Sequence, residues 1–163
     1  MRSLWAVLVV IAIAGTARAA PADDHQRGLQ AYRRGDVAGA MAALRPAAQA
    51  GHAPSQTMLA FILDRADFAE EAARLYQDAA AQGDAEGHAG LANALLVGRG
   101  IAKDEKRAWQ HFSKAAELGH AAAIDVVATA YAKGQFGQAV DTDKARQWRL
   151  RAQRPAASAP VVP

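Results

Sequence analysis

A short phrase that recurs three times constrains the fold of this chain more than any other feature. Residues 47–53, 79–85 and 115–121 read AAQAGHA, AAAQGDA and AAELGHA, so their glycines are 32 and 36 residues apart. Repeats of this period are typical of proteins built by stacking one supersecondary unit. Each glycine follows a run of helix formers, where a residue in the left-handed conformation commonly ends a helix.

A second landmark has the same phase as the first. Ala40, Ala72 and Ala108 each lie eleven residues before the glycine of their unit, and Ala145 marks a fourth copy. The unit is therefore a helix, a loop, a second helix and a tight glycine turn. This parsing predicts helix pairs at 23–34 and 36–50, 54–66 and 68–82, 85–97 and 104–118, and 121–133 and 142–153.

Acidic residues mark the expected starts of the second helices. Asp36, Asp104 and Asp141 can serve as N-caps, because an aspartate side chain accepts hydrogen bonds from first-turn amides. Asp67, with Glu70 three residues later, has the spacing of a capping box. The acids therefore predict where each second helix begins.

Apolar residues on the first helices follow a helical period. The pairs with i, i+4 spacing on one face are Leu59 with Leu63, Leu91 with Leu95, and Val127 with Tyr131. Ala60, Ala92 and Ala128 lie beside them and allow neighbouring helices to approach closely. No unit can bury its own stripe alone, so the core forms only when units stack. The chain is predicted to be all-α.

This pattern resembles the Sel1-like repeats, relatives of the tetratricopeptide repeats. Residues 87–120 are the best copy, with a glycine loop at 98–101 and the closing phrase KAAELGH at 114–120. The resemblance implies a short right-handed superhelical solenoid of about four helix-turn-helix units over residues 20–154. It also implies binding of a protein partner rather than catalysis.

The first unit, residues 24–52, departs most from this pattern. It has Gly28 where the family has a large apolar residue. Terminal units of repeat proteins are often atypical because they cap the stack.

The two ends of the chain lack the repeat. Residues 1–19 combine a positive start, an apolar run and an Ala-Arg-Ala exit, which predicts a cleaved secretory signal peptide. An uncleaved membrane anchor is the alternative, although the apolar run is shorter than the ~20 residues that a bilayer requires. Residues 155–163 are rich in proline, alanine and valine, without charge or periodicity, and are predicted to be disordered.

Charge and cysteine content narrow the class of protein. Arg2 and Arg18 are two of the 19 basic residues and leave with the signal, so the mature chain carries a formal net charge of +1. This balance argues against a nucleic-acid-binding protein, which needs a strongly basic face. The chain has no cysteine, so its stability must come from packing. Together with the signal, these features predict secretion across the inner membrane to the periplasm, with no membrane span after cleavage.

No pattern in the sequence favours catalysis, a cofactor or a metal. The glycine loop at 98–101 lacks the preceding strand and the following Lys-Ser/Thr of a phosphate loop. Asp84 and His88 have i, i+4 spacing that suits two metal ligands, but no third ligand is near. His52 and His120 occupy a position where the repeat commonly has histidine. The chain is predicted not to be an enzyme.

What remains is a binding surface. In stacked helical hairpins the first helices line the concave side, where variable side chains meet a ligand. The repeat phase places seven residues there: Gln26, Gln30, Thr57, Phe61, Asn93, Asp125 and Thr129. Their polar and aromatic groups suit a peptide segment, whereas the alternative interpretation is that they are ordinary exposed positions.

Two functional hypotheses follow. The first is an exported scaffold or adaptor that binds an envelope protein or peptide on this face. The second is a cell-wall or exopolysaccharide-related binding factor or hydrolase. A further patch, on the last helix, consists of Lys144, Arg146, Arg149, Arg151 and Arg154. It could meet an acidic partner, or it is a solvated face whose cations favour a helix C-terminus.

Overall fold

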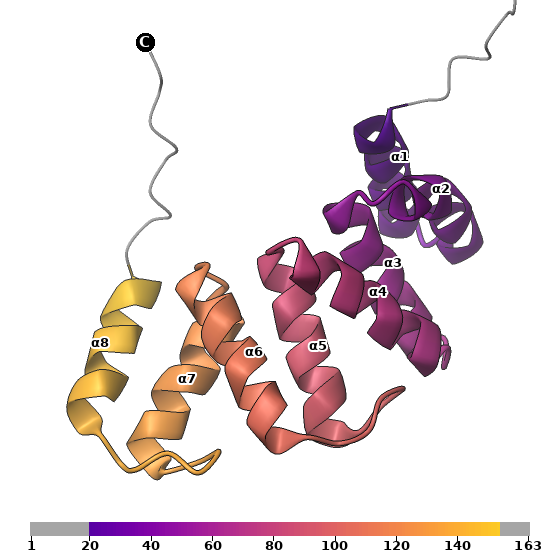
Figure 1. The fold of residues 1–163 in the computed structure, drawn as a ribbon. Coiled ribbons are helices and arrows are strands. Elements are labelled where there is room, and N and C mark those ends of the chain that lie inside the picture. The colour runs from indigo at the N-terminus through magenta and orange to yellow at the C-terminus, as the bar shows by residue number, and fades with distance from the viewer. Residues whose placement is uncertain (1–19, 154–163) are drawn as a thin grey trace, which may run out of the picture.

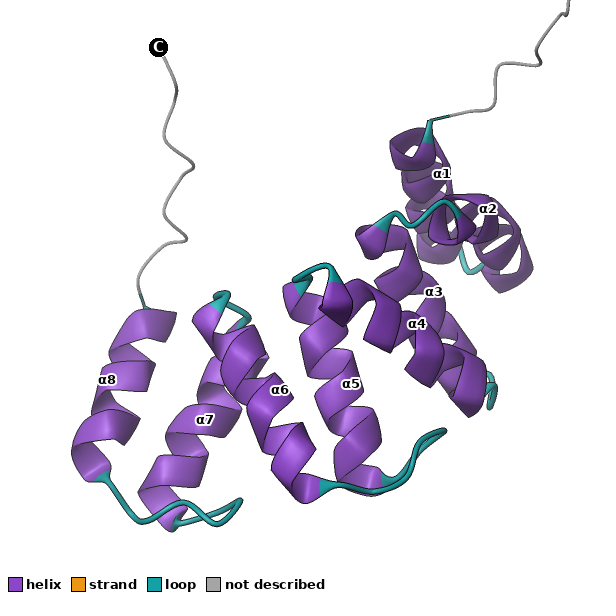
Figure 2. Cartoon of the chain, viewed as in Figure 1, coloured by secondary structure: helices purple, strands orange, loops and turns teal. Residues whose placement is uncertain are grey.

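The computed structural model describes residues 20–153, which form eight α-helices and no strand (Figures 1 and 2). The helices are α1 (Pro21–Arg33), α2 (Val37–Gln49), α3 (Ala53–Arg65), α4 (Ala69–Ala81), α5 (Ala85–Val97), α6 (Glu105–Glu117), α7 (Ala121–Lys133) and α8 (Thr142–Ala152). All the helices that the repeat predicts are present, and their ends lie within two residues of the predicted positions. The signal peptide predicted at 1–19 and the tail predicted at 155–163 lie outside the described residues.

The helices pack as hairpins, and the hairpins stack in a curved row (Figure 1). Within each hairpin the first helix packs on the second, as α1 does on α2 and α7 on α8. Each second helix then packs on the first helix of the next hairpin, so that α2 contacts α3, α4 contacts α5 and α6 contacts α7. This is the all-helical solenoid that the repeat predicts, in which neighbouring units complete one another's core.

The recurring phrase forms the turn between hairpins. Gly51, Gly83 and Gly119 have φ angles of 83°, 81° and 90°, in the left-handed region that glycine adopts without a steric penalty. The backbone then wraps round, so that the amide of His120 donates to the carbonyl of Ala115 at 2.9 Å. Equivalent hydrogen bonds close the other two turns. This closure satisfies carbonyls at the end of each second helix and explains the spacing of alanine and glycine in the phrase.

Three of the four second helices begin at the predicted acidic cap. Oδ1 of Asp36, Asp104 and Asp141 accepts a hydrogen bond from the amide three residues later at 2.8–2.9 Å. The capping box predicted at Asp67 is wrong. In this shorter unit Asp67 takes the left-handed loop position, with φ of 64°, and the cap position falls to Phe68, which has no capping side chain.

The core runs continuously through the stack. The leucines of the i, i+4 pairs on α3 and α5 are buried, as is Val127 of α7, whereas Tyr131 is half-buried. The three alanines beside them are buried too. In α1 the departure from the repeat has a packing reason. A Cβ at Gly28 would lie 2.5 Å from Cγ of Leu44, so the glycine makes room for a fully buried leucine of α2.

Candidate partner-binding groove

Three hollows follow one another along the first helices of the hairpins. The α1–α3 hollow has a volume of about 430 Å³, the α3–α5 hollow about 450 Å³ and the α5–α7 hollow about 800 Å³. Phe61 lines the first two hollows and Asn93 lines the last two. Because neighbouring hollows share a lining residue, they adjoin one another along the first helices, and the row of three is here called the first-helix groove.

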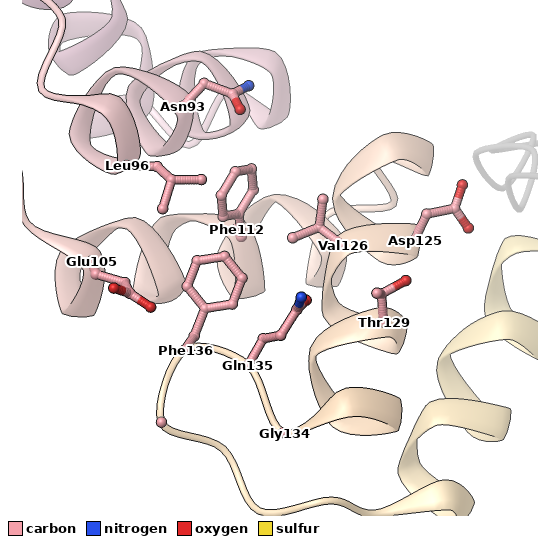
Figure 3. A pocket seen from close by; sticks show the side chains of 11 residues that line it. Asn93, Leu96, Glu105, Phe112, Asp125, Val126, Thr129, Gly134, Gln135 and Phe136 are labelled. Atoms are coloured by element: carbon pink, nitrogen blue, oxygen red, sulfur yellow. The ribbon is translucent and has the colours of Figure 1, made fainter.

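The α5–α7 hollow has the largest volume of the three. Helix α3 packs directly on α5, but no comparable contact joins α5 to α7. Figure 3 shows Phe112 of α6 and Phe136 of the α7–α8 loop between the two helices, where their rings form an apolar floor. Asp125 and Thr129 of α7 lie on one side of this floor and Asn93 of α5 on the other.

Phe136 is held in this hollow by other aromatic rings. Its ring stacks on Trp109 with centroids 5.7 Å apart and meets the edge of Phe112 at 6.0 Å. The backbone of Phe136 has φ of 54°, which a bulky side chain rarely adopts. A residue strained in this way persists only when its surroundings fix it, and such strain is concentrated at functional sites. The aromatic contacts provide that fixation.

Tyr76 of α4 forms the floor of the α3–α5 hollow. A Cβ at Gly90 of α5 would overlap the tyrosine ring, so glycine is required for α5 to lie against it. The side chain is only 8% exposed. Burial, with Asp64 and Glu86 nearby, raises the pKa of the Tyr76 hydroxyl. The hydroxyl therefore stays protonated and available as a hydrogen-bond donor.

Phe61 separates the α1–α3 and α3–α5 hollows. Its side chain is 40% exposed, while its ring meets the edge of Tyr32 at 6.1 Å and lies 5.7 Å from the guanidinium of Arg65. An aromatic ring that is held by its neighbours but open to solvent is typical of the anchors that dominate protein interfaces.

The structure places the seven predicted residues unequally. Phe61, Asn93, Asp125 and Thr129 line the groove with exposed or half-buried side chains. Thr57 also lines it, but it is only 5% exposed, and its hydroxyl donates to Oδ1 of Asp84 at 3.0 Å. Thr57 therefore braces α3 against the start of α5, because Asp84 also caps α5.

Gln26 and Gln30 are exposed on α1 but line none of the three hollows. No described helix precedes α1 to form a second wall beside them.

Sequence reasoning missed the residues that the loops and second helices contribute. These are chiefly Phe136, Gln135, Phe112 and Tyr76. One signal was present, since Phe136 lies 36 residues after Gly100 and both have positive φ. An aromatic residue at a loop position where the preceding unit has glycine indicates that its side chain makes contacts which offset the strain.

Two histidine pairs lie between helices. His25 of α1 and His52, which precedes α3, both contact Oγ of Ser55, at 3.2 and 2.9 Å. This combination resembles an activated nucleophile, but Ser55 is fully buried and cannot meet a substrate. In the second pair, Nδ1 of His88 and Nδ1 of His111 are 2.9 Å apart. Within residues 20–153, no three histidine, cysteine or acidic side chains gather in a way that could hold a metal ion.

We expect the free energy of unfolding to fall as the pH drops below about 6.5. Burial, with the neighbouring imidazole, lowers the pKa of His25 and His111, and burial with Lys114 lowers that of His88. The unfolded chain then binds more protons than the folded one in this range, so the stability present above pH 6.5 is lost at lower pH. Urea unfolding at pH 7.5 and 5.5, followed by circular dichroism, measures this loss. His88→Gln with His111→Gln should make the loss smaller, and an unchanged loss would contradict the assignment.

Arg99 ties the loop after α5 to the preceding hairpin. Its guanidinium donates to the side chains of Asp64 and Asp67 at 2.6 and 2.8 Å, and to the backbone carbonyl of Asp64. Hydrogen bonds to the two carboxylates raise the pKa of the Arg99 guanidinium above its usual value, and the bond to Asp67 contributes most. This explains why an aspartate occupies the left-handed loop position between α3 and α4.

The basic last helix is partly neutralised by its own acids. Lys144 pairs with Asp141 at 3.4 Å and Arg146 with Asp143 at 2.7 Å. Arg151 lies over the Trp148 ring at 4.7 Å from its centroid, and Arg154 lies outside the described residues. None of the helices in residues 20–153 has the length and apolar character needed to cross a membrane.

Comparison with known proteins identifies relatives of this chain in sequence and in fold. The family model described as "Sel1 repeat" matches residues 55–84, 85–120 and 121–152. The crystal structure of a Sel1 repeat protein from Oxalobacter formigenes superimposes with a TM-score of 0.77 at 22% identity, covering 86% of this chain and 59% of that one. A protective antigen of uropathogenic Escherichia coli with an SLR fold gives a TM-score of 0.71 at 25% identity, covering 82% of this chain and 30% of that one.

Among curated proteins, an uncharacterized protein of Neisseria meningitidis serogroup B is 37% identical over 142 residues. The match covers 83% of this chain but only 30% of the relative's length.

Proposed function

The chain belongs to the Sel1 repeat family, and from this premise we propose that it binds a segment of a partner polypeptide in the first-helix groove. Proteins of this family are generally scaffolds for protein–protein interaction. The observation that carries the proposal for this chain is the row of three adjoining hollows, in which Phe61 and Asn93 each line two neighbours.

The lining of the groove suits a polypeptide. The aromatic surface of exposed Phe61 and half-buried Phe136 can bury apolar side chains, which supplies most of the affinity at protein interfaces. The amides of Asn93 and Gln135 each offer both donors and an acceptor, and so can satisfy the peptide groups of an extended segment. These groups hold a ligand without reacting with it, and we propose a non-catalytic role on that basis.

We further propose that the protein works outside the cytoplasm after removal of residues 1–19. The support is the sequence pattern of a positive start, an apolar run and a small-residue exit. The absence of cysteine is compatible with an oxidising compartment, since no thiol is exposed to oxidation there.

Site-specific photocrosslinking in the source cells tests the groove. A photoreactive amino acid is placed at position 61 or 93, inside the groove, and at exposed Gln110 of α6, outside it. We expect adducts with the same polypeptide from the two groove positions and none from position 110. Equal adducts from all three positions, or adducts from position 110 alone, would contradict the proposed site.

The mass of the intact protein recovered from the cells tests the proposed cleavage, and it should correspond to a chain without residues 1–19.

The partner identified in this way allows a quantitative measurement. Phe61→Ala should weaken its binding by about tenfold or more, because truncating an interface aromatic anchor costs on the order of 2 kcal/mol. Phe68→Ala is the matched control, since Phe68 is 55% exposed but lines none of the three hollows. Isothermal titration calorimetry of both variants measures the difference, and equal weakening would remove Phe61 from the site.

A further inference from the structure

The charge of the first-helix groove differs from that of the whole protein. Residues 20–153 contain equal numbers of acidic and basic side chains, because all 16 acids lie within them and three of the 19 basic residues do not. The groove, however, is lined by five carboxylates and a single guanidinium. The carboxylates are those of Asp64, Asp84, Glu86, Glu105 and Asp125, and the guanidinium is that of Arg99.

The single guanidinium that lines the groove already has carboxylate partners. Arg99 is held by Asp64 and Asp67, so its charge is balanced within the protein. Glu86 has only an imidazole partner, with its Oε2 3.0 Å from Nε2 of His120. Glu105 and Asp125 are exposed and form no ion pair with any residue from 20 to 153. The free negative charge of the groove therefore lies mainly in the α5–α7 hollow.

The α5–α7 hollow combines this charge with an apolar floor. Figure 3 shows the rings of Phe112 and Phe136 between Glu105 at one end and Asp125 at the other. A lysine or arginine side chain has the matching parts, since its methylene stem packs on apolar surface while its cationic end reaches a carboxylate. The half-buried Phe136 ring adds attraction for a cation, especially a guanidinium.

Building on the function proposed above, we propose that the bound segment is extended and basic, with a lysine or arginine for each hollow. Packed helices lie ~10 Å apart, so neighbouring hollows are separated by about that distance. An extended polyproline-type chain rises ~3.1 Å per residue and repeats its face every three residues. Cationic side chains at every third position would therefore meet successive hollows.

Three matched peptides with the same three-residue spacing test the charge. The probe is a fluorescein-labelled peptide of four Ala-Pro-Arg triplets, and its counterparts have glutamine or glutamate in place of arginine. Fluorescence anisotropy with the whole mature protein should show binding of the arginine peptide that weakens as salt is raised, because exposed charges are screened. The glutamine peptide should bind at least tenfold more weakly, and the glutamate peptide should show no binding. Equal binding of the arginine and glutamine peptides would overturn the proposal.

Paired substitutions locate the interaction on the protein. Glu105→Gln with Asp125→Asn should weaken binding of the arginine peptide by about tenfold, since the variant loses both carboxylates that face the bound cation. Asp78→Asn with Glu117→Gln is the control, because it removes the same charge from exposed positions outside the groove. Equal weakening by both pairs would show an effect of net charge alone and would overturn the proposal.

The experiments distinguish failure of the proposed basic ligand from failure of the proposed scaffold function. Crosslinks from positions 61 and 93 that the arginine peptide does not displace would leave a groove-binding scaffold but refute a basic ligand. The absence of groove crosslinks would refute the scaffold itself. Helix α8 of a second copy also carries exposed cations at Arg149 and Arg151. Suppose that the protein self-associates but does not bind the arginine peptide, and that Glu105→Gln with Asp125→Asn abolishes the self-association. The occupant of the groove would then be a second copy of the chain, and the proposed basic partner would be refuted.

Discussion

Gly100→Ala is expected to lower the free energy of unfolding by about 3 kcal/mol. Gly100 lies in the α5–α6 loop with φ of 69°, where an L-residue costs ~1–2 kcal/mol. The added Cβ would also overlap the carbonyl of Ala69 and lie 2.7 Å from the amide nitrogen of Glu70. These are backbone atoms of the first turn of α4, so relief requires separating two hairpins, and overpacking of this kind costs ~1–3 kcal/mol. Urea unfolding followed by circular dichroism measures the loss.

Gly119→Ala separates the two causes. Gly119 has φ of 90°, but nothing lies within 4 Å of a Cβ built there. It should therefore lose only the conformational part, ~1–2 kcal/mol. Equal losses for the two variants would show that the close approach of the loop to α4 contributes nothing.

Leu95→Ala is expected to have an effect of similar size through a different cause. Leu95 of α5 is 0% exposed and belongs to the continuous core. Removing three carbons from such a site costs about 3 kcal/mol, as the lost transfer free energy and the cavity left behind add up. The unfolding midpoint in urea should fall accordingly, with an unchanged slope.

Leu118→Ala is the matched control for this substitution. The Leu118 side chain is 45% exposed, at the turn between α6 and α7. Its truncation should cost well under 1 kcal/mol, because surface substitutions away from special features change stability little. A loss at Leu95 no larger than that at Leu118 would contradict the packing described for α5.

The helix bounds could be predicted from the sequence because two independent landmarks share one phase. The turn glycines and the buried alanines of the second helices, such as Ala72 and Ala108, both recur with the unit. The landmark that failed, Asp67, belongs to the unit that lacks a glycine loop. There the shorter loop shifts the cap by one residue, and the carboxylate pairs with Arg99 from the next unit. A capping rule considers only residues within one helix turn, so it cannot include a contact between residues 32 positions apart.

The groove was only half predictable for the same reason. Phe61, Asn93, Asp125 and Thr129 follow from the repeat phase, because a face of a helix is set by residue spacing. The position of Phe136 repeats that of Gly100, but its contacts depend on how the loop folds back onto α6, and the spacing alone does not give that. The histidine pairs likewise join residues from different helices, as His88 and His111 do.

The stacking of hairpins on their nearest neighbours makes the molecule extendable by duplication. A hairpin inserted between α4 and α5 would meet on each side a surface equivalent to the one it displaced, so the flanking hairpins would need little redesign. Each added hairpin would bring one more first helix and hence one more hollow. Under the proposed function, a chain of this architecture would act as a molecular ruler, in which the number of hairpins sets the length of the bound segment.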